Sequence, residues 1–325
     1  MQDVTNLPFM RVMQRYGGPD YYVTEYFRVH ADYTLEKKIL CSITENETGR
    51  PVYAQLIGQD IEALVRVAGE LQAYPVAGID LNLGCPAPVV CRKDAGGGLL
   101  RKLDHMEAII AALRDAIPGK FTVKTRVGYD SHHEFAKLLE IFQRHAIDTL
   151  TIHGRTVTER YQTPIHPECI RMAVEQMQCP VIANGNVVDV QTGLGALRQT
   201  GADGLMIGRG AIRNPWLFDQ LRASFSGEPV AKVSRSDLLG YIEHLYQEIA
   251  AHADDFDPGK HVNRMKKYML YIVQGIDEDF EHYIRRAKIP EDFHRVCRDF
   301  LDHADPLPDR PPEKSKLFCG FDALR

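Results

Sequence analysis

The 325-residue chain has no apolar run approaching the roughly 18 residues that a membrane-spanning helix needs. It also lacks the charged and then apolar opening of a secretory signal peptide. Its seven cysteines are odd in number and include no CxxC pair, which is typical of a reducing compartment rather than of a disulfide framework. We therefore expect a cytoplasmic protein that does not enter a membrane.

Two further absences concern partners. Histidines and cysteines do not fall at zinc-ligand spacings along the sequence, so no metal site is expected. The formal net charge is −5, so the chain lacks the overall positive charge of many nucleic-acid-binding proteins. A local basic surface remains compatible with that sum, because the field near a cleft depends on the charges around it.

Seven short β-rich runs alternate with amphipathic segments of helical length. They cover residues 21–27, 51–58, 78–85, 121–128, 149–155, 180–186 and 204–210. Repeated βα units predict a parallel sheet covered by helices. Because polar residues or glycines recur at the carboxyl ends of nearly all the runs, we predict a TIM (β/α)8 barrel with its active site at those ends. A doubly wound open sheet is the alternative, but it would gather its polar residues at one switch point.

One strand is missing from this count, since such a barrel has eight. Residues 1–17 read as the loop and helix that follow a first strand, with Thr5 or Asn6 as the helix N-cap. We expect the first strand to be absent from this chain, or its place to be taken by another segment.

After about residue 225 the pattern becomes helical, and we predict a second domain of three or four helices. The expected divisions are a barrel domain at 1–228, a helical domain at 229–310 and a proline-rich tail at 311–325. Within the helical domain, Arg264 and Lys267 are expected to share a face with Tyr271. Basic residues interleaved with aromatic ones suit the phosphates and stacked bases of RNA, although most basic helix faces are only solvated.

Cys85 is the most distinctive candidate for chemistry. It lies between Gly84 and Pro86, where a strand opens into a flexible, glycine-bearing loop with four basic residues. A thiol at such a position suits proton transfer or nucleophilic attack better than inert packing. The other six cysteines are expected to be structural.

Further candidates lie at other strand ends. The glycine-rich turns VIANGN and MIGRG predict a phosphate site, to which Arg209 would add a charge. Lys124 can form a Schiff base, pair with a phosphate or hold negative charge on a reduced ring. His153 is as readily structural as catalytic. The other candidates for contacts with a ring or a substrate are Gln55, Asn82, Arg126 and Arg155.

These stretches together resemble a known family. In chain order, MQDVTN, VTEYFRV, VYAQLIG, DLNLGCPAP with GGGLL, VKTRVG, HGRT, VIANGN, MIGRG and RMKKYMLYIVQG are similar to the tRNA-dihydrouridine synthases over essentially the whole length. The resemblance implies an FMN-bearing barrel, NADPH or NADH as electron donor, and a helical domain that binds the D-loop or D-arm of tRNA. We expect the protein to be a monomer.

The resemblance also implies roles for individual residues. Cys85 would be the general acid that protonates uracil C5 while the flavin delivers hydride to C6, and Asn82 would help to hold the base. Met1 aligns with the end of the family's first strand, so we expect this chain to be less stable than one that carries the strand. FMN would be bound by Met1, Gln2, Gln55, Lys124, His153, Asn184, Gly185, Asn186, Gly208 and Arg209. The tRNA would be contacted by Arg126, Arg155, Arg264 and Lys267.

Three alternatives remain open. A related flavin barrel can act on free pyrimidines, as dihydroorotate and dihydropyrimidine dehydrogenases do, but it would not need the helical domain. An aldolase could use Lys124 in a Schiff base and would be colourless. A tRNA-binding protein without catalysis would retain no flavin and oxidise no NADPH.

Overall fold

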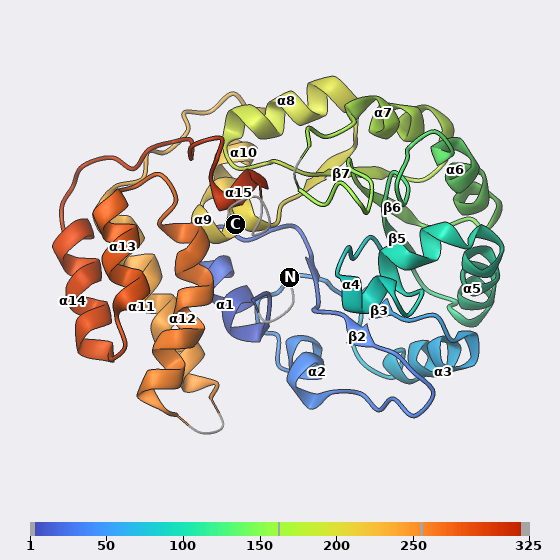
Figure 1. Ribbon diagram of the computed structural model, residues 1–325, viewed down its shortest axis with the longest axis horizontal. Helices are drawn as coiled ribbons and strands as arrows, with labels where there is room; N and C mark the ends of the chain where they lie inside the picture. Colours follow the sequence, from blue (N-terminus) through green and yellow to red (C-terminus); the bar gives the residue numbers. More distant parts are fainter. Residues whose placement is uncertain (1–3, 162, 254–255, 320–325) are drawn as a thin grey trace. The chain divides into compact units, whose positions relative to one another are not determined.

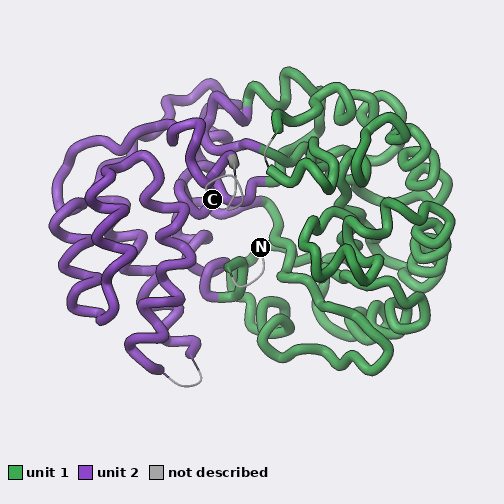
Figure 2. Tube along the Cα trace, viewed as in Figure 1, with its two compact units in different colours: residues 1–7, 20–185, 194–206 green, residues 8–19, 186–193, 207–325 purple. Residues whose placement is uncertain are grey.

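The computed structural model describes residues 4–161, 163–253 and 256–319. These residues form two compact units (Figure 2). Unit 1 contains residues 4–7, 20–185 and 194–206, and unit 2 contains residues 8–19, 186–193 and 207–319. The units are not identical to the predicted domains, because the segment 207–228 belongs to unit 2. The predicted functional division at residues 228 and 310 stays a prediction.

The centre of unit 1 is an eight-stranded parallel sheet (Figure 1). β1 and β2 both pair with β3, β1 near its start and β2 near its end, so the first predicted run is one strand interrupted at residues 24–26. From β3 onward the strand order follows the sequence. The strands are β1 (Tyr22–Val23), β2 (Phe27–Arg28), β3 (Val52–Ile57), β4 (Gly78–Leu83), β5 (Phe121–Arg126), β6 (Thr149–His153), β7 (Val181–Asn184) and β8 (Gly204–Met206).

Helices cover the outside of this sheet (Figure 1). Their first residues follow from local sequence. Asp60, for example, is the N-cap of α3, and its carboxylate accepts a hydrogen bond from the Ala63 N–H (2.9 Å). The helices of unit 1 are α2 (Lys37–Thr44), α3 (Ile61–Leu71), α4 (Pro88–Cys91), the 3₁₀ helix η1 (Gly96–Arg101), α5 (Leu103–Ala116), α6 (Phe135–Arg144), α7 (Pro167–Gln176) and most of α8 (Val190–Thr200).

The predicted barrel-type fold is confirmed, because all seven runs are strands of one parallel sheet with helices outside it. Within the described residues, no pairing joins β8 to β1, so the sheet is open between its first and last strands. The sequence predicted a gap at this place.

Unit 2 is helical. Four of its helices, α11 to α14, contact one another and make up the predicted group of three or four. Ser234 and Asp237 form a capping box at the start of α11, which explains why that helix begins there. The helices of unit 2 are α1 (Leu7–Arg15, from Pro8 on), α9 (Arg209–Arg213), α10 (Leu217–Phe225), α11 (Arg235–Ala251), α12 (Pro258–Ile272), α13 (Glu278–Arg286), α14 (Pro290–Leu301) and α15 (Lys316–Cys319).

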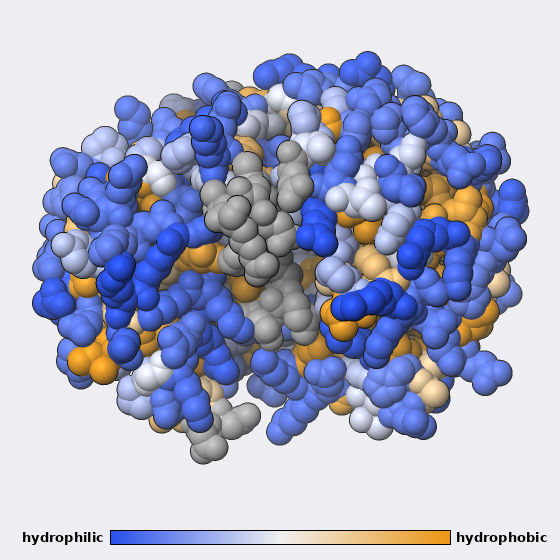
Figure 3. Space-filling view, in the orientation of Figure 1, coloured by the Kyte–Doolittle hydropathy of each residue, from blue (hydrophilic) through white to orange (hydrophobic). Residues whose placement is uncertain are grey.

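The surface is mostly polar on the face shown in Figure 3, where apolar residues lie in small scattered groups. Among the described residues, no helix combines the length and the apolar character that crossing a bilayer would require.

Candidate active site

The strand register places polar residues next to one another across the sheet of unit 1. Asp80 of β4 lies between Gln55 of β3 and Thr122 of β5. Since alternate residues of a barrel-type sheet point to the interior, the polar side chains form successive layers towards the carboxyl ends of the strands. The next layers contain the predicted residues Asn82, Lys124, Arg126, His153 and Asn184.

A chain of hydrogen bonds connects Asp80 to the turn that carries Cys85. Gln55 Nε2 donates to Asp80 Oδ2 (2.7 Å), and Asn82 Nδ2 donates to Gln55 Oε1 (2.8 Å). Asn82 Oδ1 then accepts from the backbone N–H groups of Gly84 and Cys85, both at 3.0 Å. We call these residues, Asp80, Gln55 and Asn82, the amide relay.

Asp80 sets the orientation of both amides in the relay. Burial raises the pKa of Asp80 to about 6, although hydrogen bonds from Thr122 and Gln55 and the charge of Lys124 limit the rise. At neutral pH this side chain is therefore a carboxylate, which only accepts hydrogen bonds. Gln55 must turn its NH₂ group to Asp80 and its carbonyl to Asn82, and Asn82 must then turn its carbonyl to the Cys85 turn.

Cys85 is a partly exposed free thiol at this turn. Its carbonyl oxygen accepts from the Gly97 N–H (3.1 Å) and from Cys91 Sγ (3.4 Å). A Cβ at Gly97 would lie 2.9 Å from the Cys85 carbonyl oxygen, so only glycine allows η1 to approach this closely. The three glycines 96–98 are buried, and they provide close packing rather than the loop flexibility that the sequence predicted.

Lys124 lies at the end of β5 and donates one hydrogen bond, from Nζ to Asn184 Oδ1 (3.1 Å). Burial, followed by the nearby charge of Arg126, lowers the pKa of Lys124 to about 8, while Asp80 and Cys85 act in the opposite direction. In the part of the chain that the structure describes, Lys124 has no carboxylate within ion-pair distance. Its ammonium group therefore keeps hydrogen-bonding capacity for an anionic or carbonyl-bearing ligand.

Arg126 and Arg155 are both 2% exposed, and both bind backbone carbonyl groups. Arg126 Nε donates to the Gly84 carbonyl (2.9 Å), and its NH1 donates to the carbonyls of Thr156 (2.8 Å) and Arg160 (2.9 Å). Arg126 thus joins the Cys85 turn to the loop after β6. Arg155 Nε donates to the Thr163 carbonyl (2.5 Å). Direct contact of either arginine with a substrate stays a prediction.

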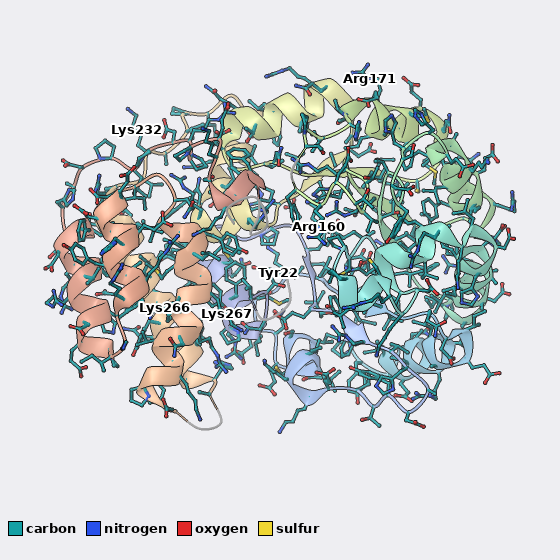
Figure 4. All side chains as sticks on the ribbon, in the orientation of Figure 1. Tyr22, Arg160, Arg171, Lys232, Lys266 and Lys267 are labelled. Atoms are coloured by element: carbon teal, nitrogen blue, oxygen red, sulfur yellow. The ribbon has the colours of Figure 1, made fainter. Side chains whose placement is uncertain are left out.

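A pocket of about 330 Å³ lies beside the Cys85 turn. Three arginines line it, Arg92, Arg101 and Arg160, together with Tyr129. The Arg101 guanidinium lies 4.5 Å from the centroid of the Tyr129 ring. Figure 4 labels Arg160, which comes from the loop that follows β6. Arg101 is ion-paired with Asp94 (2.8 Å), and the guanidinium groups of Arg92 and Arg160 add positive charge to the pocket, which favours an anion such as a phosphate.

The predicted phosphate-binding residues are divided between the units. In unit 1, Gly185 follows Asn184 with a φ of +133°, a conformation that favours glycine. In unit 2, Asn186 has a φ of +56°, and Gly208 is the N-cap of α9 with open space where a Cβ would be. Arg209 NH1 donates to the Lys316 carbonyl (2.8 Å). Phosphate binding by these residues stays a prediction, and Met1 and Gln2 lie outside the described residues.

The expected basic and aromatic face of α12 is only partly present. Arg264 and Lys267 are exposed, and Figure 4 labels Lys267 on this helix. Tyr271 is only 6% exposed and Tyr268 is fully buried, because both belong to the core of unit 2. The prediction that Tyr271 shares an accessible face with the two basic residues is wrong.

The sequence did not identify three side chains of this site. Asp80 and Thr122 lie within strands rather than at their ends, although a carboxylate inside an apolar run such as GIDLNL is a usable signal. Tyr26 was also missed. Burial raises its pKa, and the nearby Cys85 adds to the rise.

Comparison with known proteins identifies the family. A family model described as dihydrouridine synthase (Dus) matches residues 1–305. This chain belongs to the dihydrouridine synthase family. The resemblance that the motifs predicted is confirmed, and the family's enzymes are oxidoreductases that act on a CH–CH bond, which confirms the predicted enzyme class. The aldolase alternative loses its support.

Curated relatives of this dihydrouridine synthase match over most of both chains. It is 31% identical over 290 residues to the tRNA-dihydrouridine(16) synthase of Haemophilus influenzae. This alignment covers 86% of this chain and 90% of that protein. It is 29% identical to the tRNA-dihydrouridine synthase B of Xanthomonas campestris pv. campestris, over 93% of this chain and 91% of that protein.

Solved structures of lower similarity share the fold. Histamine dehydrogenase from Rhizobium sp. 4-9 has a TM-score of 0.51 at 13% identity and covers 74% of this dihydrouridine synthase and 47% of its own chain. A mutant of morphinone reductase, in complex with tetrahydroNAD, has a TM-score of 0.50 at 10% identity. The match covers 67% of this chain and 81% of the morphinone reductase chain. At these identities the likeness concerns the fold alone.

Proposed function

We propose that this dihydrouridine synthase reduces the C5–C6 bond of a uridine in the D-loop of tRNA, with Cys85 as general acid, FMN as bound cofactor and NADPH or NADH as electron donor. The observation that carries this proposal is the partly exposed Cys85 thiol on a turn held by the amide relay. The thiol lies at the end of β4, next to the strand that ends with Lys124 and Arg126. An acid, a cation and an oriented amide are thereby brought to one edge of the sheet.

The residues present fit a flavin mononucleotide. Lys124 is a cation with unused hydrogen-bonding capacity, which suits the pyrimidine edge of a flavin ring that becomes anionic on reduction. Asn184 carries an amide at the end of β7, where it accepts a hydrogen bond from Lys124, and His153 lies in register with Asn184. Gln55 lies one layer deeper in the sheet and reaches a ligand only through the hydrogen-bonding capacity that Asp80 and Asn82 leave. The turn that follows β7 at Gly185 suits the FMN phosphate, and the expected roles of Asn186, Gly208 and Arg209 stay predictions. When bound, the flavin supplies the hydride for C6 of the base.

Cys85 would supply the proton. The thiol would donate its proton to C5 of the uracil, and the resulting thiolate would be reprotonated from solvent, to which Cys85 is partly exposed. Asn82 holds the turn through two backbone N–H groups, so the sulfur does not need to be repositioned during the reaction. Tyr26, next to the thiol, would help to orient it.

Several features support tRNA as the substrate. The pocket lined by Arg92, Arg101 and Arg160 suits phosphodiester groups near the target nucleotide, and Tyr129 offers a ring for stacking. Arg264 and Lys267 are exposed cations that suit the tRNA backbone. A uridine in a loop is easier to unstack than one in a helix. We propose a monomer that acts in the cytoplasm, where its tRNA substrate is found.

The test begins with an absorbance spectrum of the purified protein, in which a flavin gives a band in the blue. The Cys85→Ala variant is then assayed for dihydrouridine in tRNA and for oxidation of NADPH. We expect a loss of about 10²- to 10⁴-fold in product formation, the usual contribution of a positioned general acid, with flavin retained. Cys41→Ala is the matched control, because Cys41 is a partly exposed thiol on α2.

Two outcomes would contradict the proposal. Undiminished dihydrouridine formation by Cys85→Ala would remove Cys85 from the acid role. Reduction of free uridine as efficiently as of tRNA would favour the alternative of a flavin barrel for free pyrimidines.

A further inference from the structure

Two loops at the carboxyl ends of β5 and β6 bring three potential metal ligands together. His132 comes from the loop between β5 and α6, while His166 and Glu168 lie at the start of α7. Each residue offers one ligand atom, and these atoms all lie within 4.8 Å of one another. The rings of His132 and His166 have centroids 4.3 Å apart and are tilted by 32°.

The distances within this group are close to those of a metal site. His166 Nδ1 lies 3.1 Å from Glu168 Oε1. Two ligands at about 2.0–2.2 Å from a tetrahedral zinc ion are about 3.4 Å apart, so this pair is nearly at ligand spacing. His132 is half-buried on a loop, and its ligand atom lies within 4.8 Å of those of His166 and Glu168.

A second carboxylate supports His166 from the other side of its ring. His166 Nε2 donates to Glu159 Oε1 (2.9 Å), and Glu159 Oε2 accepts from the Thr156 N–H (2.7 Å). Histidines that bind a metal usually donate their second ring N–H to a carboxylate, which fixes the tautomer and the ring orientation. Glu159 meets this requirement, and its own position is held by the backbone.

The charges around His166 favour a cation at this place. Two carboxylates lie at hydrogen-bonding distance from its ring, Glu168 Oε1 at 3.1 Å from Nδ1 and Glu159 Oε1 at 2.9 Å from Nε2. A divalent ion between His166 and Glu168 can also engage His132, whose ligand atom lies within 4.8 Å of both.

We propose that His132, His166 and Glu168 bind a divalent transition-metal ion, zinc before others, with a fourth position open to water. Two imidazole nitrogens and one carboxylate oxygen form a common zinc ligand set. The site goes beyond the proposed function, because it contains none of the residues assigned to the reaction. A bound ion would tie the loop after β5 to the loop after β6, which also carries Arg160 of the pocket.

The test is a titration of the untagged full chain with zinc chloride, after dialysis against a chelator and its removal, by calorimetry. We expect one ion per chain. His132→Ala and Glu168→Gln should each weaken binding at least tenfold, and Glu159→Gln should weaken it about 10- to 100-fold, as for other carboxylates that support a ligand histidine. Cobalt bound to the wild-type chain should show the visible absorption of a tetrahedral site.

Two variants are matched controls. His133→Ala removes the exposed histidine next to His132 and should leave the affinity unchanged. Cys85→Ala should also bind zinc like the wild type, which excludes the catalytic thiol as the ligand. Circular dichroism of each variant confirms that the fold is kept, and Glu168→Gln is the safest in this respect because Glu168 is exposed.

The proposal is overturned if the wild-type chain binds no zinc at micromolar concentration. It is equally overturned if binding survives both His132→Ala and Glu168→Gln, or disappears with Cys85→Ala. Because the readout is metal binding, these outcomes leave the proposed reduction of tRNA untouched, and a failure of the Cys85 assay leaves the zinc site untouched.

Discussion

Asp80→Asn is the most informative change in the amide relay, because it keeps the size of the side chain and removes one acceptor. In the wild type the Thr122 hydroxyl donates to Asp80 Oδ1 (2.7 Å), and the asparagine side chain can still accept this hydrogen bond. Its NH₂ group then faces the NH₂ group of Gln55. If Gln55 rotates, the donor conflict moves to Asn82, and if Asn82 rotates, it moves to the backbone N–H groups of the Cys85 turn. Whichever amide rotates, one pair of N–H donors in the relay faces another donor instead of an acceptor.

The expected effects on stability and on activity differ. A buried hydrogen bond left unmade costs about 1–3 kcal/mol. Against this, the variant no longer buries a carboxylate with a pKa of about 6, which is roughly two units above its ordinary value and corresponds to about 3 kcal/mol. The free energy of unfolding at pH 7 should therefore rise by about 0–2 kcal/mol, the difference between the two effects. Turnover should fall about 10- to 100-fold, since a small displacement of a catalytic group costs that much.

The pH dependence follows from the same pKa. Folded Asp80 holds its proton up to about pH 6, whereas the unfolded chain releases it near pH 4, so between these values the folded state binds more protons. This residue therefore makes the wild-type protein lose stability as the pH rises from about 4 to 6. In Asp80→Asn that contribution is absent.

The assay compares urea unfolding, flavin content and dihydrouridine formation for the wild type, Asp80→Asn and Thr122→Val. Thr122→Val removes a donor to the same carboxylate but leaves the direction of the amides unchanged. It should cost about 1 kcal/mol of stability and little turnover. Wild-type turnover by Asp80→Asn, or a loss of turnover that only matches a loss of flavin, would show that the amide relay does not position Cys85.

Two other substitutions test the surroundings of the relay. Lys124→Met should abolish flavin retention yet stabilise the flavin-free fold at pH 7 by about 2 kcal/mol. The lowered pKa of Lys124, about 8, corresponds to about 3 kcal/mol at pH 7, and the lost hydrogen bond to Asn184 offsets about 1 kcal/mol. This gain should shrink above pH 8, where folded wild-type Lys124 loses its proton. Urea unfolding at pH 7 and pH 10 measures both effects, and an equal gain at the two values would contradict them. Gly97→Ala should destabilise by about 1–3 kcal/mol and lower turnover, since its Cβ would lie 2.9 Å from the Cys85 carbonyl oxygen, whereas Gly69→Ala in α3, with open space, should not destabilise.

Predictions from the sequence succeeded where the physical signal is local. The strands were recognised because apolar residues buried on both faces of a parallel sheet form short, nearly continuous runs bounded by turns. The position of Cys85 just after a strand was predicted because glycine and proline on either side mark the end of a strand. The family followed from motifs at several such ends.

Predictions failed where the role of a residue depends on how its helix is rotated about its axis or on how deeply its side chain is buried. Tyr271 was expected on an accessible face with Arg264 and Lys267, but the packing of unit 2 turns it into the core. The glycines after Cys85 were taken for flexibility, and they are buried contacts of η1. Arg126 and Arg155 come at strand ends, as predicted, and both are buried and bind backbone carbonyls; their direct contact with a substrate stays a prediction.

Residue order along the chain was enough to indicate a parallel barrel-type sheet, a thiol at the end of one strand and a reductase of the dihydrouridine family, because strand periodicity and turn residues are short-range properties. The direction of the amide relay, the anchoring of the Cys85 turn by Arg126, and the meeting of His132 with His166 depend on side chains from different strands and loops. Only folding brings such groups within hydrogen-bonding or ligand distance, and no spacing along the sequence records that proximity.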